Sequence, residues 1–241
     1  MKNLKKDVDN YMNEELSEGV EILEEQGAES FIKKYRNLII GGIVIVVIAA
    51  LAIVFFVKSS ETKSQEASLK LSRILPYMEN GQYELALAGD KTIKIRGESL
   101  VGLKKIVADY SGTEAGMLAA FNAGICCSNL DKAKEAEEYF EIALNSSSPL
   151  IIQGANAGLG GVKESQSKFV TAAEYYVTAS EVAVDDDAKA RYGLYAGICF
   201  EKANKNDQAI ARYQEVLNLG ANSDISDYAK TGLTRLGIII D

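Results

Sequence analysis

The sequence predicts an all-α protein in which a single transmembrane helix is followed by an α-solenoid of helical hairpins. Two observations predict this fold class. Residues 38–57 form an apolar run of twenty residues without a charge, an amide or a proline. In the C-terminal half, a pattern of Gly, Ala and aromatic residues occurs three times, at intervals of 36 and 37 residues. The chain has only two prolines, which also favours helices because proline interrupts a helix interior.

The N-terminal segment, residues 1–37, is acidic, with nine Asp or Glu against six Lys or Arg. Its apolar residues fall in part at helical steps of three and four. They are Tyr11, Leu16, Val20, Leu23, Phe31 and Ile32. Two interpretations stay open: a helix that docks a cytoplasmic or membrane partner, and a solvated acidic tail, which we prefer.

The apolar run 38–57 is predicted to cross a bilayer once. At about 1.5 Å per residue, a helix of this length matches the roughly 30 Å hydrocarbon core. A buried core helix fits less well, because such helices are seldom apolar on all sides for so long. A cleaved signal peptide fits less well because a long acidic segment precedes the run. Lys33, Lys34 and Arg36 precede the run and Lys58 follows it, which favours an N-terminus on the cytoplasmic side.

Composition excludes several classes of function. The chain has a net charge of −8 and no histidine, so it lacks both the basic surface that nucleic acids require and the commonest catalytic base and metal ligand. Its three cysteines form no CxxC pair and cannot make a disulfide framework. We therefore expect no nucleic-acid partner, no metal, no cofactor and no catalytic site, and an interaction protein rather than an enzyme.

Residues 58–241 are predicted to form one helical-repeat domain. It opens with a helical hairpin over residues 58–89, whose turn is marked by Asn80-Gly81. A connector follows, with a loop over residues 89–97 and a helix that begins near Leu100. This loop carries exposed Lys91, Lys94 and Arg96 and is either a solvated insertion or a contact loop. A last helix over residues 225–236 would cap the solenoid.

The repeat is defined by three positions. A Gly in the first helix of each hairpin is followed after twelve residues by an Ala, and four residues later by an aromatic residue. The Gly and Ala would let the two helices approach closely, and the aromatic ring would fill the gap between hairpins. Polar turns over residues 129–131, 166–168 and 204–207 would join the helices. The repeat-packing residues are Gly124, Ala136, Phe140, Gly160, Ala172, Tyr176, Gly197, Ala209 and Tyr213.

This pattern resembles the tetratricopeptide repeat (TPR), whose period is about 34 residues. Equivalent repeat positions hold Cys126 and Cys199, which we expect to be buried small apolar residues. The face made by the first helices of the hairpins would be concave and would bind partners. The alternative is that its residues only pack against the next helix, in part at Phe121 and Ile125. This face contains Leu118, Phe121, Ile125, Arg191, Leu194 and Ile198.

Three motifs together with the layout of the chain resemble the YfgM-type family, in its Bacteroidetes-like branch. They are Ala86–Asp90 (ALAGD), the stretch from Gly102 to Gly116, and Ala123–Cys126 (AGIC). The resemblance implies a bitopic protein of the bacterial inner membrane with a periplasmic TPR-like domain. It also implies an accessory role at the SecYEG translocon, beside a PpiD-like chaperone, that assists unfolded or newly translocated clients. The alternative is a TPR scaffold for another envelope machine in secretion, division or motility.

Overall fold

The computed structural model describes residues 35–36, 38, 40–42, 45–51, 61–220 and 223–239. The chain divides into two compact units, Met1–Lys58 and Ser59–Asp241. In the first unit the described residues are helical, and their large apolar side chains are exposed, for example Leu38 at 77% and Ile45 at 68%. Most of the predicted acidic segment 1–37, and residues 39, 43–44 and 52–57 of the predicted span, lie outside the described residues.

Among the helices that the structure describes, none has both the length and the apolar character needed to cross a membrane. The predicted span is covered only in part, so it stays a prediction.

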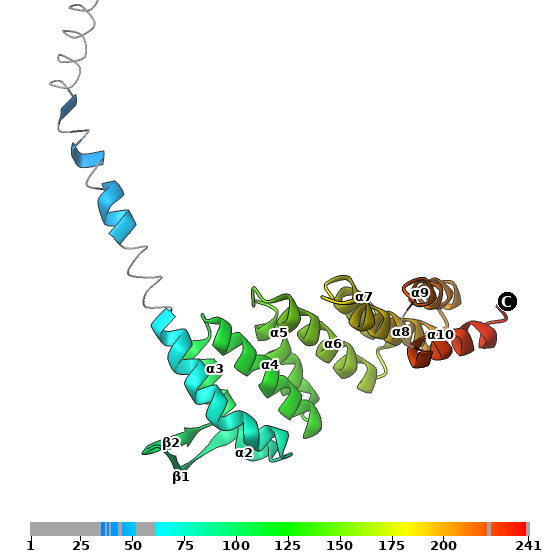
Figure 1. The fold of residues 1–241 in the computed structure, drawn as a ribbon, viewed down its shortest axis with the longest axis horizontal. Coiled ribbons are helices and arrows are strands. Elements are labelled where there is room, and N and C mark those ends of the chain that lie inside the picture. Colours follow the sequence, from blue (N-terminus) through cyan, green and yellow to red (C-terminus); the bar gives the residue numbers. More distant parts are fainter. Residues whose placement is uncertain are drawn as a thin grey trace, which may run out of the picture. The chain divides into compact units, whose positions relative to one another are not determined.

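The second unit is built almost entirely of helices, and its described part begins with a helix over residues 61–79. The helices that follow pack against one another in chain order (Figure 1). The elements are α2 (Tyr83–Ala88), β1 (Gly89–Ile95), β2 (Glu98–Val101), α3 (Leu103–Tyr110), α4 (Glu114–Asn129), α5 (Ala133–Ala143), α6 (Pro149–Ser165), α7 (Phe169–Glu181), α8 (Asp186–Lys202), α9 (Asn206–Asn218) and α10 (Ser223–Arg235).

Three helix pairs, α4–α5, α6–α7 and α8–α9, are joined by turns of the same geometry. One residue in each turn has left-handed backbone: Asp131 (φ 57°), Ser167 (φ 57°) and Asn204 (φ 58°). The next amide N–H then donates to a carbonyl five residues back in the preceding helix, over 2.8–2.9 Å, which is the bond of a Schellman C-cap. The three predicted turns are therefore confirmed, and so is the turn at Asn80-Gly81, where Gly81 has φ 75°.

The glycines and aromatic residues of the repeat meet at the seams between helices. A Cβ atom on Gly124 of α4 would lie 2.7 Å from the ring of Phe140 in α5, and one on Gly158 of α6 would lie 2.4 Å from the same ring. The ring of Tyr213 contacts Gly197 of α8 and Gly232 of α10 in the same way, with Cβ distances of 2.6 and 2.5 Å. Each of these rings thus lies between two successive first helices. The repeat alanines Ala136, Ala172 and Ala209 are fully buried.

Two clusters of buried apolar residues form the core of this unit. One extends from the helix of residues 61–79 through α6, and the other from α7 to α10. The predicted last helix is confirmed as α10, which packs against α8 and α9. Cys126 and Cys199 are buried, as predicted, at exposures of 0% and 1%.

The connector differs from the prediction. Residues 89–97, predicted as a loop, form the first strand and the turn of an antiparallel β-hairpin, and the helix predicted from Leu100 begins only at Leu103. The turn residues Arg96 (φ 53°) and Gly97 (φ 86°) both have positive φ, as a two-residue type I′ hairpin turn requires. The hairpin closes at its base because Gly89 and Gly102 lie against each other: a Cβ on either would meet the other's backbone N at 2.3 Å.

Candidate functional site

The predicted partner-binding residues lie on α4 and α8, the first helices of the first and third pairs. We call the surface on α4, α6 and α8 the A-helix face. The structure leaves Leu118, Phe121, Ile125 and Ile198 half-buried and Arg191 exposed. Leu194 is only 4% exposed and belongs to the core of the second cluster. Its assignment to a partner-binding surface was wrong, because α8 turns this side chain toward its neighbouring helices.

Phe121 is held by contacts within the chain. Its ring lies where a Cβ on Gly154 of α6 would be 2.7 Å away, and its centroid is 6.1 Å from that of Phe140. Phe121 therefore packs α4 against α6, which is the alternative role considered for it. Ile125, one helical turn further along α4, lies beside an open cleft.

This cleft lies between the ends of α4 and α6, with part of α5 beneath it, and has a volume of about 480 Å³. Its apolar lining comes from Ile125, Ala133, Phe140 and Val162, and Gly158 and Gly161 expose helix backbone to it. Ser128, Asp131 and Ser165 supply its polar groups. A pocket of this size, mainly apolar with a few polar groups, suits a large apolar side chain of a ligand.

The next seam along the chain explains why this cleft is open. Gly158 lies two residues before the repeat glycine of α6, and the same position in α8 is Tyr195. The ring of Tyr195 packs edge-on against Tyr176, with 5.4 Å between centroids. Two further lining positions also change from small to large: Gly161 corresponds to Ile198, and Ser165 corresponds to Lys202.

Equivalent positions that are filled at the α6–α8 seam are thus held by small residues at the α4–α6 seam. At Gly158 the Phe140 ring itself lies 2.4 Å from where a Cβ would be, whereas a Cβ on Gly161 would meet no atom closer than 3.6 Å, so the open space lies beside Gly161. We define this α4–α6 cleft as the candidate binding site.

Polar contacts also link the helices at the α6–α8 seam. The Tyr176 hydroxyl donates to Glu164 over 3.2 Å, and Lys202 of α8 donates to the same carboxylate over 2.7 Å. Burial raises the pKa of Tyr176 well above its usual range, and the hydrogen bond to Glu164 raises the pKa of Lys202. At the open seam, Ser128 occupies the position of Glu164 and Phe140 that of Tyr176. The α4–α6 cleft therefore lacks this polar network, and at the position of Tyr176 it is lined by the apolar ring of Phe140.

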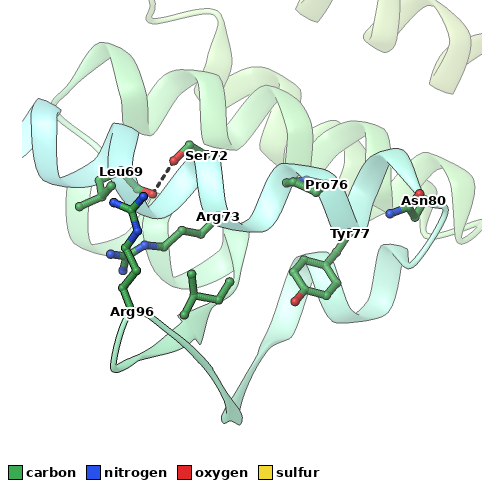
Figure 2. A pocket seen from close by; sticks show the side chains of 8 residues that line it. Leu69, Ser72, Arg73, Pro76, Tyr77, Asn80 and Arg96 are labelled. Atoms are coloured by element: carbon green, nitrogen blue, oxygen red, sulfur yellow. Dashed lines mark hydrogen bonds between the residues drawn. The ribbon is translucent and has the colours of Figure 1, made fainter.

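A second cleft lies between the β-hairpin and the helix of residues 61–79, and we call it the hairpin cleft. Its volume is about 590 Å³. It is lined by Leu69, Ser72, Arg73, Pro76, Tyr77, Asn80, Ile95 and Arg96 (Figure 2). Apart from Arg96, none of these residues was predicted to lie on a contact surface, because the hairpin that creates the cleft was predicted as a loop.

The described residues contain no group of three His, Cys, Asp or Glu side chains placed to hold a metal ion. Comparisons of the chain with protein-family models and with curated proteins gave no match. The geometry of the two clefts is therefore the basis on which a function can be proposed.

Proposed function

We propose that this chain is a membrane-anchored interaction protein whose TPR-like domain binds segments of other proteins at the A-helix face. The observation that carries this proposal is the α4–α6 cleft, where small residues replace the large ones of the next seam. A partner that inserts one aromatic or large aliphatic side chain there would contact Phe140, Ile125 and Val162. It would fill space that the larger Ile198 and Lys202 occupy at the equivalent positions of the next seam.

The anchor is the apolar run 38–57. The described part of this run is helical and exposes large apolar side chains, such as Val46 at 67% and Leu51 at 64%. A contiguous apolar surface of this kind is stable only in an apolar surrounding, and a lipid bilayer supplies one. In this proposal the N-terminus is cytoplasmic and residues 58–241 are periplasmic.

The partner that we propose is the SecYEG translocon, with a PpiD-like chaperone beside it. This part of the proposal rests on the resemblance of three motifs to the YfgM-type family. Newly translocated, unfolded chains expose aromatic side chains that would otherwise be buried, and the α4–α6 cleft suits such side chains. A domain tethered beside the translocon would meet these segments as they emerge.

A pull-down with the tagged full-length chain in mild detergent tests the partner. We expect translocon subunits and a PpiD-like chaperone at near-stoichiometric amounts. If a different envelope complex dominates and translocon subunits are absent, the chain is a scaffold of that complex and the Sec assignment fails.

A pair of variants at one position tests the cleft. A Cβ on Gly161 would meet no atom closer than 3.6 Å, so Gly161→Ala leaves the cleft open, whereas the side chain of Gly161→Leu would occupy it. We expect co-purified clients to be lost with Gly161→Leu and retained with Gly161→Ala. Equal recovery of clients with both variants would contradict binding in the α4–α6 cleft.

The topology is tested with single added cysteines, because the natural ones that pack in the core are shielded. In spheroplasts, a membrane-impermeant maleimide should label Lys63→Cys directly and Ser17→Cys only after lysis. Labelling of Ser17→Cys before lysis would reverse the proposed orientation. Release of the chain by alkaline carbonate would contradict the anchor.

A further inference from the structure

The hairpin cleft brings arginines together with apolar residues. Arg96 reaches from the tip of the hairpin toward the helix of residues 61–79, where Arg73 also lines the cleft (Figure 2). Beside them lie Pro76, Ile95 and Leu69, of which Leu69 is a large apolar residue at 46% exposure. The cleft therefore offers guanidinium groups next to an apolar surface.

Arg96 occupies a position that the fold alone does not explain. Its φ of 53° is left-handed, a conformation that Asn, Asp or Gly adopt more readily than Arg and that type I′ turns usually give to Asn-Gly. Within the described part of the chain, Arg96 makes no hydrogen bond or ion pair. A residue that is unfavourable for the turn and unpaired in the structure points to a role outside the fold.

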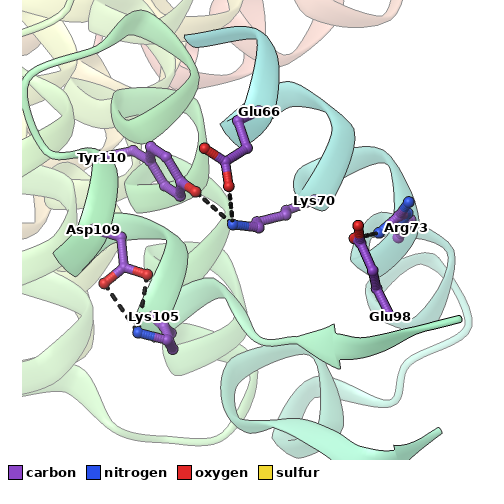
Figure 3. Close-up of polar contacts among 7 residues, drawn as sticks. All are labelled: Glu66, Lys70, Arg73, Glu98, Lys105, Asp109 and Tyr110. Atoms are coloured by element: carbon purple, nitrogen blue, oxygen red, sulfur yellow. Dashed lines mark hydrogen bonds and ion pairs between the residues drawn. The ribbon is translucent and has the colours of Figure 1, made fainter. Parts of the chain in front are cut away.

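Arg73 shows that this surface accepts a carboxylate. It forms an ion pair with Glu98 of β2 (Figure 3). The Arg73 side chain is only 13% exposed, so it is fixed by its surroundings, whereas Glu98 is 62% exposed. One carboxylate thus already lies at this side of the cleft, and the second guanidinium, that of Arg96, is without one.

The charge of the hairpin contrasts with that of the chain. The hairpin carries three exposed basic residues, Lys91, Lys94 and Arg96, against two acidic ones, Asp90 and Glu98, whereas the chain as a whole carries a net charge of −8. Lys94 is bonded to Ser99 over 2.7 Å. A local basic surface on an acidic protein attracts acidic ligands to one place and disfavours them elsewhere.

We propose that the hairpin cleft binds an acidic peptide segment of a partner protein. A Glu or Asp side chain of that segment pairs with Arg96, and an adjacent large apolar side chain packs on Leu69, Pro76 and Ile95. Arginine matches the planar carboxylate with two parallel hydrogen bonds. A free phosphate would use the guanidinium groups but would leave the apolar lining without a partner. This site is separate from the α4–α6 cleft, and the proposal does not rest on the proposed function.

The test uses the full-length chain in mild detergent and a fluorescein-labelled peptide, Glu-Leu-Glu-Leu-Glu-Leu with an amidated C-terminus. Binding is followed by fluorescence anisotropy. We expect saturable binding that weakens by about tenfold or more in Arg96→Asn, since a charge-assisted bidentate pair is lost. The matched control is Lys91→Asn, which removes the same charge from the hairpin outside the cleft and should change affinity by less than about twofold.

The Arg96→Asn variant also separates binding from folding. Asn suits the left-handed turn position better than Arg, so its melting temperature should equal or exceed that of the wild type. Wild-type affinity in Arg96→Asn, or an equal loss in Lys91→Asn, would overturn the site. So would equal binding of a Lys-Leu peptide of the same length.

Two further measurements distinguish this site from its alternatives. Gly161→Leu should bind the acidic peptide normally, because its change lies in the other cleft, and a loss there would contradict two separate sites. Glycerol phosphate, the polar part of an anionic lipid, should displace the peptide no better than acetate does. Displacement at much lower concentration than acetate would overturn the peptide proposal in favour of a lipid headgroup.

Discussion

The phenol hydroxyl of Tyr213 donates a hydrogen bond of 2.7 Å to the carboxylate of Glu201. Glu201 also accepts two hydrogen bonds from Arg235 of α10, over 2.8 and 2.9 Å. One carboxylate therefore links α8, α9 and α10. Tyr176 and Glu164 stand in the same relation one repeat earlier, twelve residues apart in each case. The network belongs to the repeat, and its loss should weaken the packing of successive helices.

Replacement of Tyr213 by Phe should destabilise the domain. The Tyr213 side chain is fully buried, and Tyr213→Phe removes a hydrogen bond to a charged acceptor without leaving a cavity. We expect a loss of about 1–2 kcal/mol in the free energy of unfolding, measured by urea denaturation followed by circular dichroism. The loss falls at the lower end of the range for charged acceptors because Arg235 still satisfies Glu201.

The matched control is Tyr176→Phe. Its hydroxyl bond to Glu164 is longer, at 3.2 Å, so we expect a smaller loss than for Tyr213→Phe. At the equivalent positions of the first helix pair, Phe140 replaces the tyrosine and Ser128 replaces the glutamate, so this repeat position also accepts Phe. A stability of Tyr213→Phe equal to that of the wild type would contradict a structural role for the network.

The same carboxylate predicts a dependence of stability on pH. Its hydrogen bonds with Arg235, and then with Tyr213, lower the pKa of Glu201 below its ordinary value of 4.5. A group with a lowered pKa in the folded state contributes stability that is fully present above the unfolded pKa and is lost as pH falls through the folded pKa. The stability difference between wild type and Glu201→Gln should be constant from pH 7 to about 5 and shrink at lower pH.

Thermal unfolding at a series of pH values measures this difference. Glu174→Gln is a suitable control, because Glu174 is exposed and its side chain has no hydrogen-bond or ion-pair partner within the described residues. A difference between wild type and Glu201→Gln that grew on acidification would show that the carboxylate destabilises the fold, and the interpretation would be wrong.

The features that the sequence predicted well depend on residues close together in the chain. The turns at Asp131, Ser167 and Asn204 follow from polar residues between two helical patterns. The glycine and aromatic pairs follow from a fixed spacing within one hairpin. Positions with the same spacing in each repeat pack in the same way, so three copies supported one another.

The features that were not predicted lie outside the repeat pattern or depend on differences between its copies. In the strand over residues 89–95, only Ile93 and Ile95 alternate with polar residues, and Arg96-Gly97 is a weak turn signal, so these residues were interpreted as a loop. The α4–α6 cleft arises because Gly161 and Ser165 stand where Ile198 and Lys202 stand one repeat later. Alignment of the copies would have revealed this difference, but the space it creates is visible only once the helices are packed. Leu194 was assigned to a partner-binding surface because helical spacing shows which residues share a face of a helix. It does not show whether another helix covers that face.

Overpacking of a repeat glycine tests the register of the repeat. A Cβ on Gly197 would lie 2.6 Å from the ring of Tyr213, which is fully buried and cannot move aside. We expect Gly197→Leu to lower the stability by about 1–3 kcal/mol and to lower the melting temperature. Gly161→Ala is the control, since its Cβ meets only Tyr176 Oη at 3.6 Å, and it should be neutral or stabilising because Ala favours a helix over Gly by about 1 kcal/mol.

An unchanged melting curve for Gly197→Leu would show that the α8–α9 seam is looser than the structure indicates. A loss of stability in Gly161→Ala as large as that in Gly197→Leu would show that any helix glycine is sensitive, whatever its seam.

The three cysteines should be unreactive in the folded chain. Cys126 and Cys127 are fully buried in the first core cluster, and Cys199 is buried in the second. Burial raises the pKa of Cys126 to about 11 and that of Cys199 to about 12, from an ordinary value of 9.0. The thiolate, which is the reactive form, is then at least about a hundredfold scarcer near neutral pH than in an exposed cysteine.

We expect no modification by a thiol reagent at pH 8 and three modified thiols after denaturation. Ser111→Cys, on an exposed turn, provides a reactive control. Because the cysteines lie in separate core clusters, mass spectrometry of chains labelled in mild denaturant reports which cluster opens first. If Cys126 and Cys199 were labelled in the native chain as fast as Ser111→Cys, neither core cluster would be shielded from solvent. The helix packing at the seams would then be contradicted.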